Sequence, residues 1–455
     1  MRTICWAVCA IALTCAAAAA PIEVSLSYER YPVPPPGEYN LGFRPYGGQG
    51  FYQDTEKAPE GDWKLPKLLS ETPRYGLLTL GDRKHLFVMD QKAADDAFYT
   101  RAYLDVNANN DLTDDAPIDS TGEEGDSSFY QATFPRVDLD IVVDGKTLPY
   151  SFDFYIYGFQ EGSQGVMDRI AGLFSKAKKK PLLNVSMGVR VACAYTAKFE
   201  AAGRNYTVWL GDGDANGRFN DPMRPYEEAI IDEKTLYLLG DHLYVTDTDK
   251  IEFSDAFLLA DKLLLSDALF GVKVDVPGGK MTLTPITEGL GTLTFPEAPS
   301  KLQVCTDDRK SGLMLFRPGK KAIVPPGDYR LLSYVVKRTD KQGDQWRLNA
   351  AGTVDCPLVK VASGKDTELP FGEPFRPIAT VGKWERDLIA KGDRTEVRLN
   401  LEIEGAGKEL VNDLFHTGEK TDIRLAENKL RPKEPTYKVM KADGELVTSG
   451  QFEYG

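Results

Sequence analysis

Apolar and polar residues alternate with a period of two along much of this chain, as expected for half-buried β-strands. The runs at residues 85–90 and 98–106 are also rich in aromatic and branched side chains. Within residues 137–159, Asp144 and Gly145 stand between two apolar stretches, which predicts a β-hairpin. The pattern therefore predicts a mainly β, multi-domain protein built of β-sandwich-like modules.

One segment has a helical period instead. Its apolar residues recur three, four and seven positions apart, and lysines gather at its C-terminal end, where cations favour the helix dipole. The apolar stripe consists of Val166, Met167, Ile170, Leu173, Phe174 and Ala177. We expect one short amphipathic helix that covers a sheet, and contact of its basic side with a membrane is the alternative.

The length of 455 residues predicts about three domains. We place one β-rich unit at residues 21–160, a second at 161–294, and a third region at 301–455, after a proline-containing linker. In the third region, a Pro-Pro-Gly-Asp turn at 325–328 leads into an apolar run, which suggests an immunoglobulin-like or prealbumin-like β-sandwich. A final hairpin is predicted around residues 442–444, like the closing strands of small sandwich modules.

Residues 1–20 have the form of a secretory signal peptide, with one arginine, a short apolar run and a string of alanines. We therefore expect export to the periplasm, the cell surface or the extracellular space. No later run approaches the ~18 apolar residues of a membrane-spanning helix. Beyond the signal, Cys193, Cys305 and Cys356 are too few for a disulfide scaffold, and the pairing of Cys305 with Cys356 is left open.

The formal net charge is −13 at pH 7. Such an acidic chain is an unfavourable partner for nucleic acid or for anionic membranes, but it is compatible with bound cations. The chain has only three histidines and lacks the G-x-S-x-G and H-E-x-x-H motifs, which argues against a serine hydrolase and a zinc site of those types.

Two loops rich in Asp and Asn carry the strongest chemical signal. In the second loop, oxygen-bearing residues follow a strand-like run at every second position, and Gly217 takes the sixth position, where a sharp turn favours glycine. The candidate ligands are Asp212, Asp214, Asn216, Arg218 through its carbonyl, and Asp221. Oxygen ligands at this spacing suit a hard cation such as Ca²⁺.

The first loop repeats this pattern upstream. Its candidate ligands are Asp105, Asn107, Asn109, Asp111 and Asp114. Asn110 takes the turn position, which suits it because asparagine tolerates a left-handed backbone. The two matching copies favour a divergent internal duplication.

Both loops resemble the calcium-binding loop of EF-hand and dockerin-type modules, D-x-[DN]-x-[DN]-G, over about a dozen residues in each copy. The resemblance implies that the candidate ligands bind calcium. Position 12, usually a bidentate acid, is Ala116 in one copy and Met223 in the other, and Asp119, Glu227 and Glu228 are candidates to replace it. As a whole, the chain resembles secreted bacterial proteins built of β-domains with Asp/Asn-rich loops.

We thus expect an exported, non-enzymatic β-protein with calcium-stabilised loops, a structural or binding role, and a glycan or protein as candidate partner. Interpretation of both loops as plain polar turns stays open, because Asp, Asn and Gly favour tight bends. The alternative function is a carbohydrate-binding module or a carbohydrate-active enzyme that uses exposed aromatic residues and a pair of carboxylates.

Overall fold

The computed structural model describes residues 20–31, 49–53, 56–94, 96, 98–125, 129–160, 182–225, 234, 236, 238–248, 256–381, 386, 390–391, 399–417 and 431–453. These residues form strands in several separate sheets, which confirms a mainly β, multi-domain protein. The predicted helix at 166–177 and the predicted signal peptide, except its last residue, lie outside the described residues. None of the helical segments described is long and apolar enough to cross a membrane.

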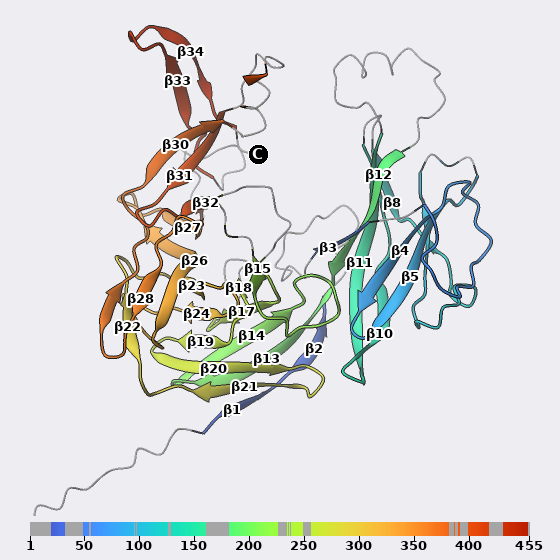
Figure 1. The fold of residues 1–455 in the computed structure, drawn as a ribbon, viewed down its shortest axis with the longest axis horizontal. Coiled ribbons are helices and arrows are strands. Elements are labelled where there is room, and N and C mark those ends of the chain that lie inside the picture. Colours follow the sequence, from blue (N-terminus) through green and yellow to red (C-terminus); the bar gives the residue numbers. More distant parts are fainter. Residues whose placement is uncertain are drawn as a thin grey trace, which may run out of the picture.

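The largest sheet has 12 strands and forms the base and one side of the molecule (Figure 1). Its order is β1 (Ile22–Ser25), β21 (Lys280–Pro285), β20 (Ala268–Asp275), β19 (Lys262–Leu265), β24 (Gly312–Phe316), β23 (Lys301–Thr306), β26 (Gly327–Thr339), β27 (Gln345–Ala351), β32 (Leu410–His416), β31 (Leu399–Glu404) and β30 (Arg376–Val381), with β28 (Val359–Val361) beside β26. Because β19 pairs in parallel with β24, this sheet continues across the linker at residues 295–300.

Two smaller sheets carry the Asp/Asn loops. The five-stranded sheet has the order β18 (Ala256–Leu258), β17 (His242–Thr246), β14 (Arg204–Gly211), β13 (Cys193–Ala201) and β2 (Ser27–Arg30). The four-stranded sheet has the order β4 (Arg74–Leu80), β5 (Arg83–Asp90), β6 (Arg101–Leu104) and β7 (Ile118–Asp119). The first loop follows β6 and the second follows β14, so each loop extends from an inner strand of its sheet.

A six-stranded sheet stands beside the four-stranded one in Figure 1. It has the order β3 (Gln49–Gln53), β12 (Leu182–Val191), β11 (Lys146–Gln160), β9 (Phe129–Thr133) and β8 (Gly122–Gly125), with β10 (Val137–Val143) on β11. The turn from β10 to β11 is the hairpin predicted at Asp144 and Gly145, whose φ angles of 50° and 74° are of the kind these residue types tolerate.

The remaining sheets are small. They contain β22 (Gly291–Thr294) with β25 (Lys321–Val324) and β29 (Asp366–Glu368), β15 (Arg224–Pro225) with β16 (Leu238–Leu239), and β33 (Thr436–Met440) with β34 (Leu446–Gln451). The last pair confirms the hairpin predicted around residues 442–444. It forms a two-stranded sheet of its own.

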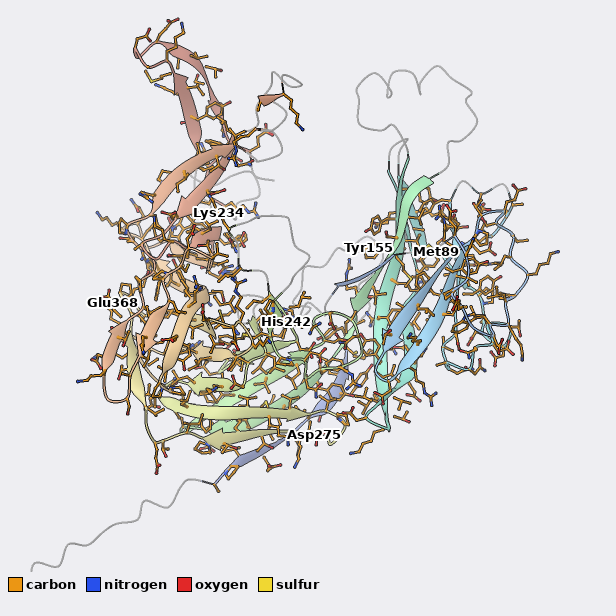
Figure 2. The ribbon with its side chains drawn as sticks, in the orientation of Figure 1. Met89, Tyr155, Lys234, His242, Asp275 and Glu368 are labelled. Carbon is orange, nitrogen blue, oxygen red and sulfur yellow. The ribbon has the colours of Figure 1, made fainter. Side chains whose placement is uncertain are left out.

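One buried apolar cluster connects the sheets around both loops. It includes Val24 of β1, Met89 of β5, Phe152 of β11, Leu210 of β14 and Met314 of β24. Figure 2 shows Met89 in the part of the molecule built from β4, β5 and β11. Because burial of apolar side chains is the main stabilising term in folding, these sheets are held together by a shared core.

The three cysteines of the described chain are buried and free. The structure therefore answers the open question about Cys305 and Cys356, which do not form a disulfide. Burial raises the pKa of Cys193 to about 12 and that of Cys305 to about 11. Thiols with such pKa values behave as small apolar core residues rather than as nucleophiles.

Candidate metal centre

The second Asp/Asn loop is organised around the carboxylate of Asp212, which is fully buried directly after β14. Its Oδ2 accepts two hydrogen bonds of 2.7 Å, from the Tyr150 hydroxyl and from the backbone N–H of Gly217. Its Oδ1 accepts longer ones, 3.3 Å from the N–H of Asp214 and 3.2 Å from that of Asn216. Oδ1 is therefore the oxygen with the greater remaining capacity to coordinate an ion.

A carboxylate from outside the loop lies beside it. Asp241 directly precedes β17, which pairs with β14 and so brings this residue to the end of the same sheet. Its side chain is fully buried, and its two oxygens accept the backbone N–H groups of Gly213 at 2.8 Å and of Asp221 at 2.6 Å. Asp241 cannot be found from the sequence pattern of the loop, because spacing along the loop carries no information about a residue supplied by another strand.

Three carboxylates converge at this loop. Asp212, Asp214 and Asp241 each offer an oxygen, and these oxygens lie within 4.8 Å of one another. Oδ2 of Asp214 accepts a hydrogen bond of 2.7 Å from Arg224, whereas its Oδ1 is buried and has no hydrogen-bond partner. Elsewhere in the described chain, no three Asp, Glu, His or Cys side chains converge in this way.

The other predicted ligands of the second loop support its shape. Nδ2 of Asn216 donates to Asp221 at 2.6 Å, and its Oδ1 accepts the backbone N–H of Arg218 at 2.7 Å. The guanidinium of Arg218 binds Asp82 at 2.6 Å and Asp144 at 3.2 Å. This side chain therefore neutralises acids beyond the loop, and a ligand role for its carbonyl stays a prediction.

The buried carboxylates have strongly raised pKa values. Burial raises the pKa of Asp212 to about 7, and the neighbouring charge of Asp214 acts in the same direction. Burial also raises the pKa of Asp241 well above its ordinary value, and the charge of Asp212 adds to the effect. Both pKa values show that ionising these groups is costly without a cation, and a divalent cation would relieve that cost.

The first loop repeats the hydrogen bonds of the second. Oδ1 of Asp105, another fully buried acid, accepts the N–H of Asn109 at 3.1 Å, and its Oδ2 accepts the N–H of Asn110 at 3.0 Å. Nδ2 of Asn109 donates to Asp114 at 2.8 Å, and its Oδ1 accepts the N–H of Asp111 at 2.7 Å. Each of these bonds has its counterpart at the corresponding position of the second loop.

The backbones of the two loops match as well. Ala108 and Ala215 occupy the same loop position with φ angles of 55° and 59°, and Asn110 and Gly217 do so with 66° and 81°. Positive φ is uncommon for alanine, so its recurrence at one position indicates a shared loop conformation rather than two unrelated turns. This agreement supports the internal duplication inferred from the sequence.

The first loop differs in its charges. Asn107 stands where the second loop has Asp214, and its Oδ1 accepts the N–H of Asn109 at 3.0 Å. Asp111 binds Lys64 at 2.7 Å, and this hydrogen bond lowers the pKa of the acid to about 2. The predicted ligand Asp111 is therefore already neutralised by a lysine in this structure.

Asp115, which is not among the ligands predicted from the sequence, lies beside the first loop. Burial raises the pKa of Asp115 to about 6, and the charges of Asp105, Asp114 and Asp111 add to the shift. Its Oδ2 is buried and has no hydrogen-bond partner in the described chain. Asp115 thus has a free oxygen for an ion, whereas the predicted substitute Asp119 pairs with Arg101 at 2.7 Å.

The other predicted substitutes for position 12 are placed differently. Glu227 and Glu228 lie outside the described residues. Met223 itself is buried in the shared core, so its own position offers no ligand. At the first loop, the ring of His85 contacts the backbone of Asp105. Its Nδ1 lies 2.8 Å from the Asp105 carbonyl oxygen, which gives this strand histidine a structural role.

Gly217→Ala is expected to destabilise the protein by about 2 to 3 kcal/mol, because the residue has φ 81° and the added Cβ would lie 2.7 Å from Ile141 Cδ1 and 2.9 Å from the backbone nitrogen of Gly81. Gly203→Ala is the matched control, since Gly203 has φ 70° and open space around it. Urea unfolding measures both variants. Equal losses would show that close packing against Gly81 does not constrain the loop.

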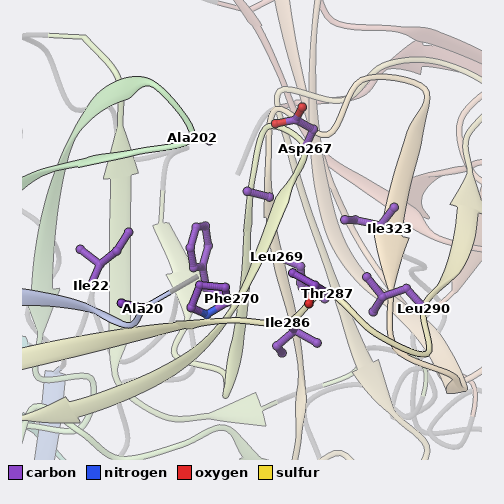
Figure 3. Close-up of a pocket in the computed structure, with 12 residues that line it drawn as sticks. Ala20, Ile22, Ala202, Asp267, Leu269, Phe270, Ile286, Thr287, Leu290 and Ile323 are labelled. Carbon is purple, nitrogen blue, oxygen red and sulfur yellow. The ribbon is translucent and has the colours of Figure 1, made fainter. Parts of the chain in front are cut away.

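A separate pocket of about 480 Å³ lies where β20 begins and β21 ends, and Ile22 of β1, Ala202 and Ile323 of β25 also line it (Figure 3). Its lining is mostly apolar, with Ile22, Phe270, Ile286 and Leu290 among its residues, and Asp267 is its one charged residue. A glycosidase needs two carboxylates flanking one bond, and this pocket offers one.

Comparison of the chain with family models, with curated proteins and with solved structures gave no match.

Proposed function

We propose that this chain is an exported, non-enzymatic β-protein whose two Asp/Asn loops bind calcium, and that its role is structural or binding. The observation that carries the proposal is the convergence of Asp212, Asp214 and Asp241, two of them fully buried. Like charges held so close repel each other unless a proton or a cation lies between them.

The donor set of the second loop fits a hard cation. All candidate atoms are oxygens, which calcium prefers in sets of six to eight. Oδ1 of Asp212, the unpartnered Oδ1 of Asp214 and an oxygen of Asp241 are the first candidates. Asp241 then takes the role that position 12 has in the related motif, where this chain has Met223. Asn216 and Asp221 are further candidate ligands.

Calcium at these loops would stiffen contacts between sheets. The backbone N–H of Gly81, at the turn from β4 to β5, donates to the carbonyl of Asn216 at 2.7 Å. The first loop is tied in the same way, since the N–H of Lys64 donates to Asn110 and the N–H of Leu112 donates to Lys64, both at 2.9 Å. An ion that fixes either loop therefore also fixes the segment bonded to it.

Thermal melting in calcium tests this proposal. Millimolar calcium is expected to stabilise the protein by ~0.4 to 3 kcal/mol per site, if the dissociation constants lie between roughly 10⁻³ and 10⁻⁵ M. The melting temperature should rise relative to protein freed of metal on a chelating resin. Isothermal titration with calcium should give a stoichiometry near two.

Single variants distinguish calcium binding at the first loop from calcium binding at the second. Asp214→Asn is expected to weaken the second site, and Asp114→Asn the first. Asp366→Asn is the matched control, because Asp366 is an acid with an exposed side chain that forms a salt bridge with the surface residue Lys321 at 3.3 Å. Identical melting temperatures with and without calcium, or equal calcium responses in all three variants, would contradict the proposal.

A further inference from the structure

Each Asp/Asn loop has one basic side chain of the same chain among its carboxylates. At the second loop, Nη2 of Arg224 donates to Oδ2 of Asp214 at 2.7 Å, and its Nη1 lies 3.9 Å from Oδ2 of Asp221. At the first loop, Nζ of Lys64 donates to Oδ2 of Asp111 at 2.7 Å. All three acids are candidate calcium ligands, so a positive charge of the chain itself already contacts each candidate site.

Backbone pairing fixes the position of Arg224. The residue belongs to β15, where it pairs with Leu239 of β16, and Asp241 follows that strand after one residue. The backbone N–H of Asp221, three residues before Arg224, donates to Asp241 at 2.6 Å. Arg224 therefore extends from a short sheet whose two ends are bonded to each other at the candidate ligands.

Lys64 is held by backbone hydrogen bonds as well. It pairs with Asp111 in an isolated parallel bridge, so its backbone lies directly beside the first loop. Its N–H donates to the carbonyl of Asn110, and its carbonyl accepts the N–H of Leu112, both at 2.9 Å. Surface ion pairs are usually weakened by the entropy of ordering two long side chains. Here the backbone places the lysine beside its partner, so less of that entropy is lost on pairing.

The contact of Arg224 leaves the other oxygen of its nearest partner available. Oδ1 of Asp214 is buried and has no hydrogen-bond partner in the described chain. The candidate ligand oxygens of Asp212, Asp214 and Asp241 lie within 4.8 Å of one another. An ion on these oxygens would therefore share the carboxylate of Asp214 with the guanidinium, and the two positive charges would repel each other.

We propose that Arg224 is a tethered cation, which neutralises part of the second loop when calcium is absent and lowers the affinity of that loop for calcium. Lys64 has the same role at the first loop. This inference rests on the proposed function, because it concerns the regulation of the same sites. The affinity of calcium sites depends on the charge of the ligand set, and each tethered cation cancels one negative charge. The weakened sites respond to calcium at roughly 10⁻⁴ to 10⁻³ M, the range of extracellular modules.

The two tethered cations differ in exposure and therefore in expected effect. The side chain of Arg224 is 44% exposed, whereas that of Lys64 is 73% exposed. Water and salt screen a charge more strongly where it is more exposed. Removal of the charge should raise the calcium affinity ~10-fold at the second loop and about 2-fold to 3-fold at the first.

Isothermal titration with calcium tests the proposal at the second loop. The titrations use Asp114→Asn as the parent protein, in which the first site is weakened. Adding Arg224→Gln should lower the dissociation constant ~10-fold, because the ion no longer approaches a fixed positive charge. Adding Arg224→Lys keeps the charge, and the dissociation constant should stay within about 3-fold of the parent value. A purely structural role predicts the opposite sign for Arg224→Gln, since a loosened loop would bind calcium more weakly.

Arg376→Gln is the matched control. It removes the same charge from a salt bridge with Glu404, and the Arg376 side chain is 64% exposed in β30 of the third region. Its dissociation constant for calcium should equal that of the parent within about 2-fold, because solvent screens so distant a charge. An equal gain in affinity in Arg376→Gln and Arg224→Gln would reflect net charge alone and would overturn the proposal.

Melting in metal-free buffer gives a second measurement. Without calcium, Arg224→Gln should melt at a lower temperature than the native protein, because Asp214 and Asp221 lose their nearby positive charge. The same variant should gain more from added calcium. A native protein that binds no calcium overturns both this inference and the proposed function. A native protein that binds calcium as tightly as Arg224→Gln, or more tightly, overturns this inference alone.

Discussion

Replacing Asp212 with alanine is expected to lower the free energy of unfolding by about 3 to 6 kcal/mol when calcium is present. The change removes, in a fully buried site, the carboxylate that accepts the hydrogen bonds of the Tyr150 hydroxyl and of the Gly217 N–H, and each buried hydrogen bond lost costs about 1 to 3 kcal/mol. The binding free energy of the ion at this loop is lost in addition.

Without calcium, the same substitution is expected to cost less. The alanine variant removes a buried carboxylate whose ionisation is opposed by burial and by the charge of Asp214. Relief of this penalty offsets part of the loss of hydrogen bonds. The difference between the two measurements equals the binding free energy that calcium contributes through Asp212, which no measurement in a single buffer isolates.

Chemical denaturation of the native protein and of Asp212→Ala, each in metal-free buffer and in calcium, gives the four free energies of unfolding that this comparison needs. Asp105→Ala gives the comparison at the first loop, where two N–H groups lose their acceptor. Asp366→Ala serves as the surface control and should stay within about 0.5 kcal/mol of the native protein. An equal cost of Asp212→Ala in both buffers would mean that the carboxylate only organises a polar turn.

Of the features of the candidate site, the turn conformation of the two loops follows most directly from the sequence. Their conformation depends on local side chains that bond to their own backbone, and on positive φ at Asn110 and Gly217, so residue types at fixed spacing carry the information. Asp241 and Asp115 were missed for different reasons. Asp241 arrives through the pairing of β17 with β14, and Asp115 is distinguished only by its burial.

The fold, too, has features that the sequence predicts and features that it does not. Alternation of apolar residues predicted individual strands and the hairpin at Asp144, because both follow from short-range periodicity and turn chemistry. The order of strands was not predictable. β1 and β2 are separated by one residue, yet β1 pairs with β21 and β2 pairs with β13, in two different sheets. Such pairings depend on which distant apolar surfaces fit together, which no single segment encodes.

Lowering the pH from about 8 to about 5 is expected to remove most of the stabilisation by calcium, because release of the proton from Asp212 alone costs about 3 kcal/mol at pH 5. Calcium binds ionised carboxylates, and the pKa of Asp212 is raised to about 7 by burial and then by the charge of Asp214. The pKa of Asp241 is raised as well. Below these pKa values, protons compete with the ion.

In the metal-free protein, the pH dependence of stability that these carboxyl groups cause has the opposite sign to that of ordinary acid denaturation. A carboxyl whose folded-state pKa lies above its unfolded value of ~3.9 binds more protons in the folded state, so stability falls as pH rises from about 4 through 7. His242 and His85 act the other way. Burial lowers the pKa of His242 to about 4 and also lowers that of His85, so stability is lost as pH falls below ~6.5.

The difference between melting temperatures with and without calcium isolates the carboxylates, because the histidine effects enter both measurements and cancel. This difference should be large at about pH 8 and close to zero at about pH 5. Metal should be removed on a resin, since soluble chelators weaken in acid and would mimic the result. If the rise in melting temperature caused by calcium stays constant across this pH range, no buried carboxylate exchanges its proton for the ion. Calcium would then bind elsewhere on the molecule.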